Sequence, residues 1–315
     1  RLVPARERFF LENIVDLDVG YISMASEKGA VSLAMGRKFF YLGTGLILNG
    51  RGDGAELDIY SGILDLKLMG AYTGLLKKDN NPYGLSYADY SDGARRIFAG
   101  GAMEKRIGNQ TLYLMGLAQI DRGKEEENTK TRYQSQYYGG GLRGILSDSL
   151  DYYGEFVYET GKSYRSGSTE QKDVKAYAGL AGISYFLKTA FNPALILHYA
   201  YGSGDKDRNN YKSSTANAAD DDTGFLSFGT YIGGYALRPV LGNLHIFRGG
   251  FSFVPFYASD YRTLRRLNIE AKYSYYMKDK KEGQINYGEA PFPNKDVGQA
   301  VDAALRWGIY YDLAF

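Results

Sequence analysis

Charged side chains recur at every second position in several long stretches of this chain. In RRLNIEAKYSYY, Arg266, Glu270 and Lys272 share one parity, whereas Leu267 and Ile269 share the other. A period of two is typical of a β-strand with one polar and one apolar face. A row of guanidinium, ammonium and carboxylate groups on one face can steer ions or form ion pairs between strands. The chemistry predicted for these residues is therefore electrostatic.

Covalent catalysis finds little support in the residue types present. The chain has no Cys, which excludes thiol nucleophiles, disulfides and cysteine-ligated zinc, and it has 2 His. His198 is predicted on the polar face of its strand and His245 on the apolar face, and the spacing enforces no Ser–His pair. We predict no enzymatic activity and no cofactor.

Acidic residues gather in one long segment between predicted strands. GDKDRNN and ADDD supply Asp205 and Asp207, followed by Asp220, Asp221 and Asp222. Carboxylates can bind Ca²⁺, but these lack the ligand spacing of a calcium loop. A solvated acidic loop is the favoured interpretation, with Asp205 and Asp207 kept as candidate metal ligands.

The alternation recurs along the chain and predicts long strands. ILDLKLMGAY places Leu64, Leu66 and Leu68 opposite Asp65 and Lys67. Such runs exceed the about 5–6 residues of ordinary strands and reach the about 9–11 that a tilted strand needs to cross a bilayer. The predicted segments are 12–25, 30–40, 53–61, 63–76, 93–106, 110–122, 132–146, 149–160, 172–187, 190–203, 242–257, 262–277 and 298–315.

Composition separates a membrane barrel from a soluble β-protein. The 315 residues include 30 Tyr but 16 Phe, and Tyr suits the aromatic girdles at the two membrane interfaces of a barrel. Mean hydropathy is −0.36, and no long apolar run predicts a transmembrane helix. The net charge of +2 gives no nucleic-acid footprint. A soluble sandwich would have to bury one face of every strand in a single core, which the long charged faces disfavour.

The connections between predicted strands alternate between short and long. SEKGA, IGNQ and LSDS are short, whereas DRGKEEENTKT and segment 202–242 are long. Short periplasmic turns and long external loops are typical of outer-membrane barrels. We predict a single outer-membrane β-barrel domain over 1–315, with 202–242 as an external loop that folds partly over or into the mouth.

The predicted fold is all-β: a closed transmembrane antiparallel up-and-down β-barrel of about 14–18 strands in the outer membrane of a Gram-negative bacterium. Its apolar parity faces lipid and its polar parity faces a water-filled lumen. The chain begins at Arg1 without a signal sequence, so we expect a processed or trimmed mature chain. The residues predicted to face lipid near the end of the chain are Leu267, Ile269, Tyr273, Val301, Leu305 and Trp307.

Three stretches of sequence add a narrower signal. They are GRKFFYLGTGLILNGRGDGAELDIY, then YAYGSGD followed by FGTYIGGYALRPVLGNLHIFRGGFSFVP, and finally DVGQAVDAALRWGIYYDL. Together they resemble the alginate export family of outer-membrane porins, although Gln299 and Ala300 replace an acidic residue in the last stretch. The resemblance implies export of an anionic polysaccharide through an arginine-rich constriction.

Strand parity assigns charged residues to the lumen wall. The predicted pore-lining basic residues are Arg37, Lys67, Arg96, Arg106, Lys175, Arg248, Arg266, Lys272 and Arg306. The predicted pore-lining acidic residues are Asp65, Glu155, Glu159, Glu270 and Asp302. A positive patch in the late strands is one interpretation. Cross-strand ion pairs that only hold the wall together fit the pattern equally well.

The resulting functional prediction is an outer-membrane channel for diffusion or export of a hydrophilic solute, above all an anionic polysaccharide. One alternative is a barrel scaffold or sheath whose lumen is occupied by a partner protein, and another is a barrel enzyme. The predicted partners are the lipid bilayer, the polysaccharide or another hydrophilic solute, and a periplasmic partner protein, with no nucleic acid. Conductance across a planar bilayer separates an open pore from a plugged sheath.

Overall fold

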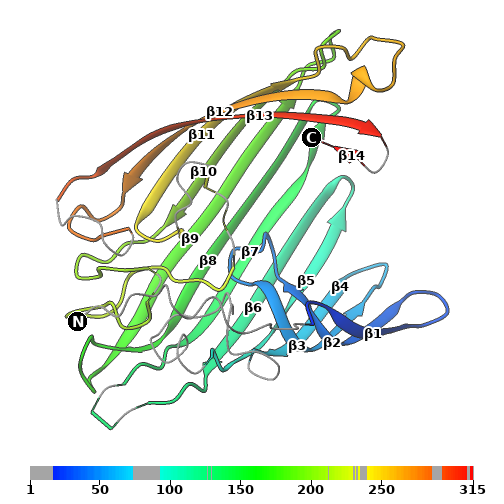
Figure 1. Cartoon of the computed structure of the whole chain (residues 1–315). Coiled ribbons are helices and arrows are strands. Elements are labelled where there is room, and N and C mark those ends of the chain that lie inside the picture. The colour runs from blue at the N-terminus through cyan, green and yellow to red at the C-terminus, as the bar shows by residue number, and fades with distance from the viewer. Residues whose placement is uncertain are drawn as a thin grey trace, which may run out of the picture.

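The polypeptide forms one antiparallel sheet whose strands follow chain order from β1 to β14 (Figure 1). The computed structural model describes residues 17–73, 93–125, 127–128, 130–211, 213–229, 231, 233–234, 240–285, 293–310 and 313–314. The strands are β1 (Gly20–Ala25), β2 (Val31–Tyr41), β3 (Asn49–Ile59), β4 (Asp65–Tyr72), β5 (Arg96–Ile107), β6 (Gln110–Asp121), β7 (Gln134–Ser147), β8 (Leu150–Tyr164), β9 (Gln171–Phe186), β10 (Ala194–Gly202), β11 (Leu244–Phe253), β12 (Leu267–Lys278), β13 (Asp296–Tyr310) and β14 (Leu313–Ala314). A single 3-10 turn, η1 (Leu264–Arg266), precedes β12.

Every predicted segment overlaps one of the long strands β1 to β13, so the periodicity identified all of them. The pairing is regular, and β5 pairs with β6 along its whole length. Short connections such as 108–109 and 148–149 lie at one end of the sheet, whereas 122–133 and 203–243 lie at the other. The alternation of short and long connections is therefore the topology that the sequence predicts.

The sheet curves into a trough that stays open along one side. Figure 1 shows β11 to β13 rolling over one flank of the trough and β1 to β4 over the other. Among the described residues, β1 pairs only with β2, and β13 pairs only with β12 and the 2-residue β14. These strands do not close the sheet into the predicted barrel. In the described ranges, the outer edge of β1, a strand of 6 residues, meets no other strand. The described ranges also hold no helix long and apolar enough to span a membrane.

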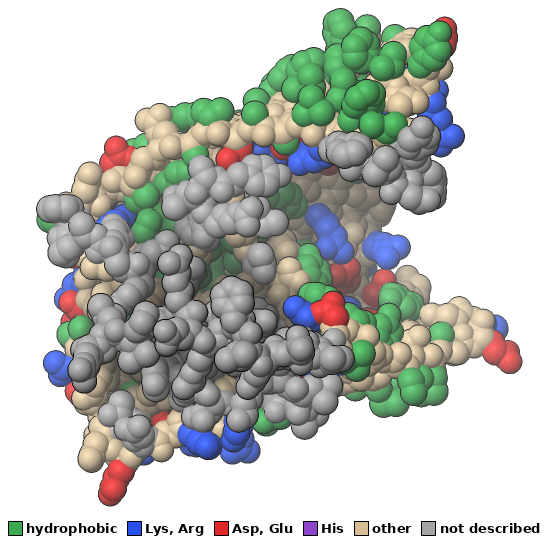
Figure 2. Space-filling view, viewed as in Figure 1, with side chains coloured by type: hydrophobic (Ala, Val, Ile, Leu, Met, Phe, Trp, Pro, Cys, Tyr) green, Lys and Arg blue, Asp and Glu red, His purple; other side chains and the backbone are tan. Residues whose placement is uncertain are grey.

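The two faces of the sheet differ strongly in character. On the convex face, Leu114, Leu197 and Val301 are 63%, 64% and 73% exposed. On the concave face, the charged residues Arg96 and Glu159 are fully buried. Figure 2 shows apolar side chains on the outer surface of the rim and charged side chains inside the hollow. An apolar exterior around a polar interior is the arrangement of a membrane barrel.

Val301 offers a direct test of the lipid-facing surface. It lies near the middle of β13, opposite Tyr273 of β12. Val301→Arg should lower the free energy of unfolding by about 2–4 kcal/mol, because a charge near the bilayer midplane loses its hydration. Ala304→Arg should change stability little, because position 304 has the other parity and lies opposite Glu270. Urea titration of protein refolded in vesicles measures both variants, and equal losses would show that the two faces share one environment.

Candidate functional site

Charged residues of the last two long strands line up across the concave face. Lys272 in β12 lies opposite Asp302 in β13. Glu270 Oε1 lies 2.5 Å from Lys272 Nζ, and Glu270 Oε2 accepts a hydrogen bond from Arg306 Nη1 at 3.1 Å. Two cations therefore share one carboxylate on this wall.

Strands β10 and β11 extend this charged row. His198 lies opposite Arg248, and its ring packs edge-on against Tyr153 of β8, with centroids 5.8 Å apart. Arg248 donates from Nε to Ser274 Oγ at 3.0 Å and from Nη2 to the carbonyl of Gly233. Arg248 thus places a positive charge on the wall and also ties residue 233 of the long connection to it.

Ion pairs cross-link the strands on the opposite flank of the trough. Glu56 of β3 pairs with Lys38 of β2 and with Lys67 of β4, whose Nζ lies 3.2 Å from Glu56 Oε2. Lys67 Nζ also lies 3.4 Å from Asp58 Oδ1. Ion pairs of this kind stabilise the pairing of adjacent strands. On this flank the charged residues therefore fit the alternative in which they hold the wall together.

Glu155 of β8 holds the segment between β2 and β3 against the concave face. Its carboxylate accepts hydrogen bonds from Thr44 N and Thr44 Oγ1, both at 2.7 Å, and from Tyr113 Oη at 2.6 Å. Gly43 has a φ of +58°, and a Cβ there would lie 2.2 Å from Glu155 Oε2. Only glycine therefore fits at this close approach, and segment 42–48 reaches across the trough to β8.

Glu159, on the same face of β8, holds the long connection between β10 and β11. Its Oε2 accepts a hydrogen bond from Leu226 N at 2.9 Å, and its Oε1 accepts one from Tyr133 Oη. Tyr137 Oη lies 3.0 Å from Glu159 Oε1 and 2.6 Å from the carbonyl oxygen of Leu226. The carboxylate is fully buried. A fully buried carboxyl group that pairs with a backbone N–H and two tyrosine hydroxyls is a strong local anchor, because leaving buried polar groups unpaired is costly.

The two inward segments meet each other on the concave face. Phe228 N donates to Ile47 O at 3.2 Å, and Asn49 N donates to Phe228 O at 3.5 Å. Residues 42–48 and 222–229 are hereafter called the inner constriction. Because both halves are joined to each other and anchored on β8, the inner constriction is one unit.

Aromatic and charged side chains pack beneath the inner constriction. The rings of Phe228 and Phe98 meet edge-on with centroids 5.1 Å apart. The Arg96 guanidinium lies 5.3 Å from the centroid of the Phe228 ring, and Arg96 Nη1 lies 3.0 Å from Asp121 Oδ2. Arg96 is fully buried. Arg96, which is predicted to line the pore, is therefore covered by the inner constriction.

The long connection also contains a buried ion pair of its own. Arg208 and Asp222 pair with both side chains fully buried, and the Arg208 guanidinium lies 5.3 Å from the centre of the Tyr211 ring. Burial lowers the pKa of Arg208, but Asp222 and the neighbouring tyrosines raise it, and the pKa lies above its ordinary value. The guanidinium stays charged, and the pair fixes the fold of this segment.

The candidate metal ligands have other roles. Asp205 is buried, and its carboxylate accepts hydrogen bonds from Asp207 N at 2.7 Å and from Thr223 N at 2.9 Å. Asp207 Oδ2 lies 3.9 Å from Lys206 Nζ. Within the described ranges, His, Asp and Glu form no group of three able to hold a metal ion. Asp205 acts as a turn-forming acceptor, as short acidic side chains often do.

The sequence profile of the alginate export family matches residues 83–314, which is most of the chain. The chain belongs to the alginate export family. The family resemblance is thereby confirmed, and the later quoted stretches lie within the matched range. No curated protein sequence gives a significant match.

The chain is also similar to solved structures of outer-membrane proteins. OccK11 (OpdR) of Pseudomonas aeruginosa has a TM-score of 0.51 and 14% identity over 88% of this chain and 67% of its own. OccAB1 of Acinetobacter baumannii has a TM-score of 0.45 and 14% identity over 79% of this chain and 58% of its own. OmpT, an outer membrane protein of Vibrio cholerae, has a TM-score of 0.45 and 9% identity over 88% of this chain and 76% of its own. The likeness to OccK11 supports the fold. Family and fold together identify an outer-membrane β-barrel channel of a Gram-negative bacterium.

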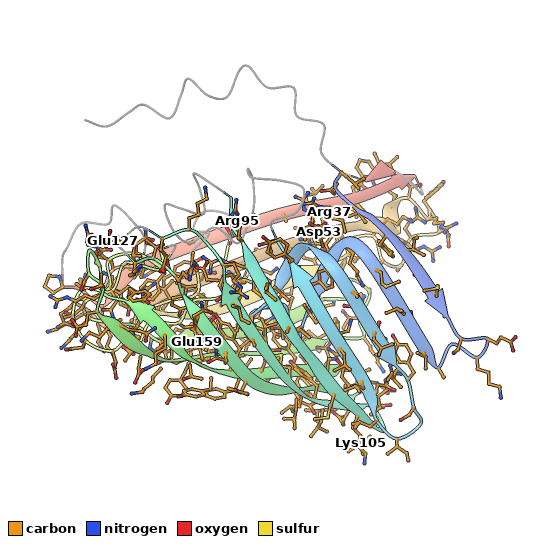
Figure 3. The ribbon with its side chains drawn as sticks, turned by 90° about the horizontal axis from the view of Figure 1, so that it is seen from below. Arg37, Asp53, Arg95, Lys105, Glu127 and Glu159 are labelled. Carbon is orange, nitrogen blue, oxygen red and sulfur yellow. The ribbon has the colours of Figure 1, made fainter. Side chains whose placement is uncertain are left out.

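Two residues predicted to line the pore, Arg37 and Lys175, lie on the other face of the sheet. Arg37 is on the face of β2 opposite to that of Lys38, with Nη1 3.9 Å from Asp53 Oδ1, and the two labelled side chains lie together in Figure 3. Lys175 is on the convex face of β9, with its side chain 52% exposed. Arg266 closes the 3-10 turn η1 before β12, and its side chain lies beside Gly308, which has the concave parity of β13. The positions of Arg37 and Lys175 correct the prediction for these two residues.

Local sequence explains each correction. Arg37 and Lys38 are adjacent, so one of them must face away from the trough. The concave face of β9 carries Ala176 and Ala178, because segment 222–229 packs on that wall, and polarity there no longer marks the inside.

The remaining predicted residues keep the concave parity. Arg106 and Asp65 lie near the short-turn end of the sheet, where Asp65 Oδ1 accepts a hydrogen bond from Ser61 N at 3.1 Å. Arg96, Glu155 and Glu159 lie under or against the inner constriction. The concave-face residues outside it are Lys67, Arg248, Lys272, Arg306, Glu270 and Asp302.

Proposed function

We propose that this outer-membrane channel conducts an anionic polysaccharide. The observation that carries the proposal is the row of cations on the concave face of β11 to β13. Arg248, Lys272 and Arg306 supply three positive charges against the carboxylates of Glu270 and Asp302. Membership of the alginate export family supports the same class of solute.

The spacing of this row suits a polymer that carries one charge per sugar. Adjacent strands lie about 4.8 Å apart, so cations on successive strands form a continuous band. Three cations and two carboxylates leave one net positive charge, spread over a wall several residues wide. A band with weak excess charge binds each anionic sugar loosely, so the polymer can enter and also leave.

The inner constriction gives the channel its second property, a limited width. Its halves are fixed to β8 through Glu155 and Glu159 and therefore narrow the trough over the middle of the sheet. A narrow polar path admits an extended chain and rejects bulky solutes. In this proposal residues 1–315 act as one barrel domain, with 202–242 on the external side, and a periplasmic protein delivers the polymer.

Current block by soluble polymer tests the proposal. Alginate oligosaccharides added to one chamber of a planar bilayer should interrupt the current through single channels, with block frequency rising in proportion to concentration. Neutral dextran oligosaccharides of matched length are the control and should block far less often. Equal block by both polymers would show selection by width alone, and a bilayer that stays non-conducting would favour a sheath occupied by a partner.

A further inference from the structure

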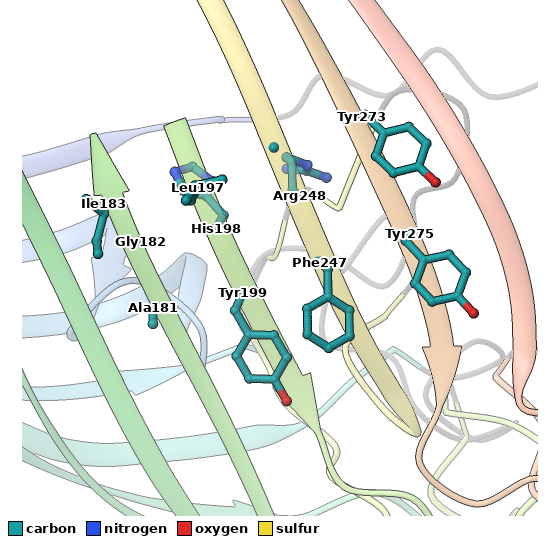
Figure 4. A pocket seen from close by; sticks show the side chains of 11 residues that line it. Ala181, Gly182, Ile183, Leu197, His198, Tyr199, Phe247, Arg248, Tyr273 and Tyr275 are labelled. Atoms are coloured by element: carbon teal, nitrogen blue, oxygen red, sulfur yellow. The ribbon is translucent and has the colours of Figure 1, made fainter. Parts of the chain in front are cut away.

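Tyr153 of β8 lies on the concave face, between the inner constriction and the short-turn end of the sheet. It stands opposite Arg143 of β7 on one side and opposite Gly182 of β9 on the other. The same row continues from Gly182 to His198 of β10 and Arg248 of β11, and Figure 4 shows these three positions side by side. One row of the sheet therefore carries an aromatic ring between two arginines.

The ring of Tyr153 lies over the backbone of Gly182. A Cβ at position 182 would come within 2.3 Å of Tyr153 Cε1 and 2.8 Å of Tyr153 Cζ, so the ring fills the space that a side chain of β9 would occupy. The His198 ring meets it edge-on, at an interplanar angle of 71°, so the two rings do not stack. Because Tyr153 is half-buried and rests on the wall with one face, its other face is turned to the lumen.

Polar groups of balanced charge surround this ring. Arg143 Nη2 lies 3.0 Å from Glu104 Oε2, and the Arg143 side chain is 49% exposed. Asp151 lies two residues nearer the short turn on the same face of β8. A guanidinium has five N–H donors, so Arg143 can pair with Glu104 and also donate to another oxygen. The surroundings of the ring thus offer hydrogen-bond donors and acceptors without a strong net charge.

The long connection between β10 and β11 approaches the same ring. Arg248 Nη2 donates a hydrogen bond to the carbonyl oxygen of Gly233. Burial raises the pKa of Tyr231 to about 12, Tyr153 adds to the rise, and Arg248 opposes it. Tyr153 therefore lies beside the chain that continues from the inner constriction.

We propose that Tyr153 is a stacking platform for one pyranose ring of the polysaccharide, with Arg143 and Asp151 bonding to the hydroxyl groups of that sugar. The C–H face of a sugar ring packs on an aromatic face, whereas the hydroxyl groups at its rim need polar partners. The platform rests on the proposed function, but it recognises the sugar ring and not its charge. The cations of β11 to β13 govern how often a polymer enters, and the platform governs how long it stays.

The duration of single blocks in a planar bilayer tests the platform. Tyr153→Ala should shorten blocks by alginate and by dextran oligosaccharides about fivefold, which corresponds to about 1 kcal/mol, since about 1.4 kcal/mol is a factor of ten. Tyr153→Phe keeps the ring and should keep the parental duration. Tyr152→Ala is the matched control, because Tyr152 is the adjacent tyrosine on the convex face, where its hydroxyl bonds to Gln110.

Gly182→Ala is a second variant, which keeps the ring of Tyr153 but displaces it from the wall, and it should also shorten the blocks. It replaces Tyr153→Ala if that variant does not fold. Parental block duration in Tyr153→Ala, or equal shortening in Tyr152→Ala, would overturn the platform. The ratio of alginate to dextran block frequency tests the anionic polysaccharide, whereas block duration tests the platform, so failure of one proposal is distinguishable from failure of the other.

Discussion

Replacing Glu159 with Ala will detach part of the inner constriction and give the channel a second, larger conductance level. The variant removes the acceptor for Leu226 N and for Tyr133 Oη and takes away a neighbour of Tyr137 Oη. An ordinary hydrogen bond contributes about 0.5–1.5 kcal/mol, and each buried donor left without an acceptor costs about 1–3 kcal/mol. A loss of about 3 kcal/mol raises the detached fraction roughly a hundredfold, since about 1.4 kcal/mol is a factor of ten. Single-channel recording measures the time spent at the larger level.

Glu170→Ala is the control for Glu159→Ala. Glu170 lies in the connection between β8 and β9, and its side chain is 51% exposed where it pairs with Lys172. An exposed pair contributes about 0–1 kcal/mol, so this variant should keep the parental conductance. Parental conductance in Glu159→Ala would instead show that the inner constriction is held without Glu159.

Replacing Lys272 and Arg306 together with Ala will reverse the ion preference from anions to cations. The substitution leaves Arg248 against Glu270 and Asp302, so the local net charge changes from one positive to one negative. Glu270→Gln should act in the opposite direction and strengthen the anion preference, because it removes the carboxylate that the two cations share. Reversal potentials under a KCl gradient measure both effects.

Lys175→Ala is the matched control for these charge variants. Lys175 has the same charge as Lys272, but it lies on the convex face beside Asp221, whose Oδ2 is 3.0 Å from Lys175 Nζ. Its removal should leave the reversal potential unchanged. A shift as large as that of the Lys272 and Arg306 variant would mean that distant surface charge, and not the lumen wall, sets the selectivity.

Periodicity in the sequence is enough to predict the strands and most of their faces. Each long strand alternates polar and apolar side chains, because one face meets lipid and the other meets water or packed polar groups. The parity rule assigned His198 to the concave face and His245 to the convex face, as found. It failed at Lys175, because the concave face of β9 is covered by the chain's own segment 222–229 and is therefore apolar.

The inner constriction could not be predicted in the same way. Segment 42–48 is a short apolar stretch between two strands, and its partner Glu155 is 111 positions away from Thr44. No local pattern links residues so far apart. Strand parity places Glu155 and Glu159 on the inward face, but it does not show that backbone N–H groups of segments 42–48 and 222–229 donate hydrogen bonds to their oxygens. Gly43, with its positive φ and close approach to Glu155, is the one local signal of this contact.

The reversal potential of the unmodified protein in a planar bilayer is the most direct test of a cationic lumen wall. Under a KCl gradient at low salt, chloride should permeate better than potassium. The preference should weaken as salt rises, because the Debye length falls to about 3 Å at 1 M. A preference for potassium that persists unchanged when Lys272 and Arg306 become Ala would contradict the role assigned to β11 to β13, and with it the selection of an anionic polysaccharide by charge.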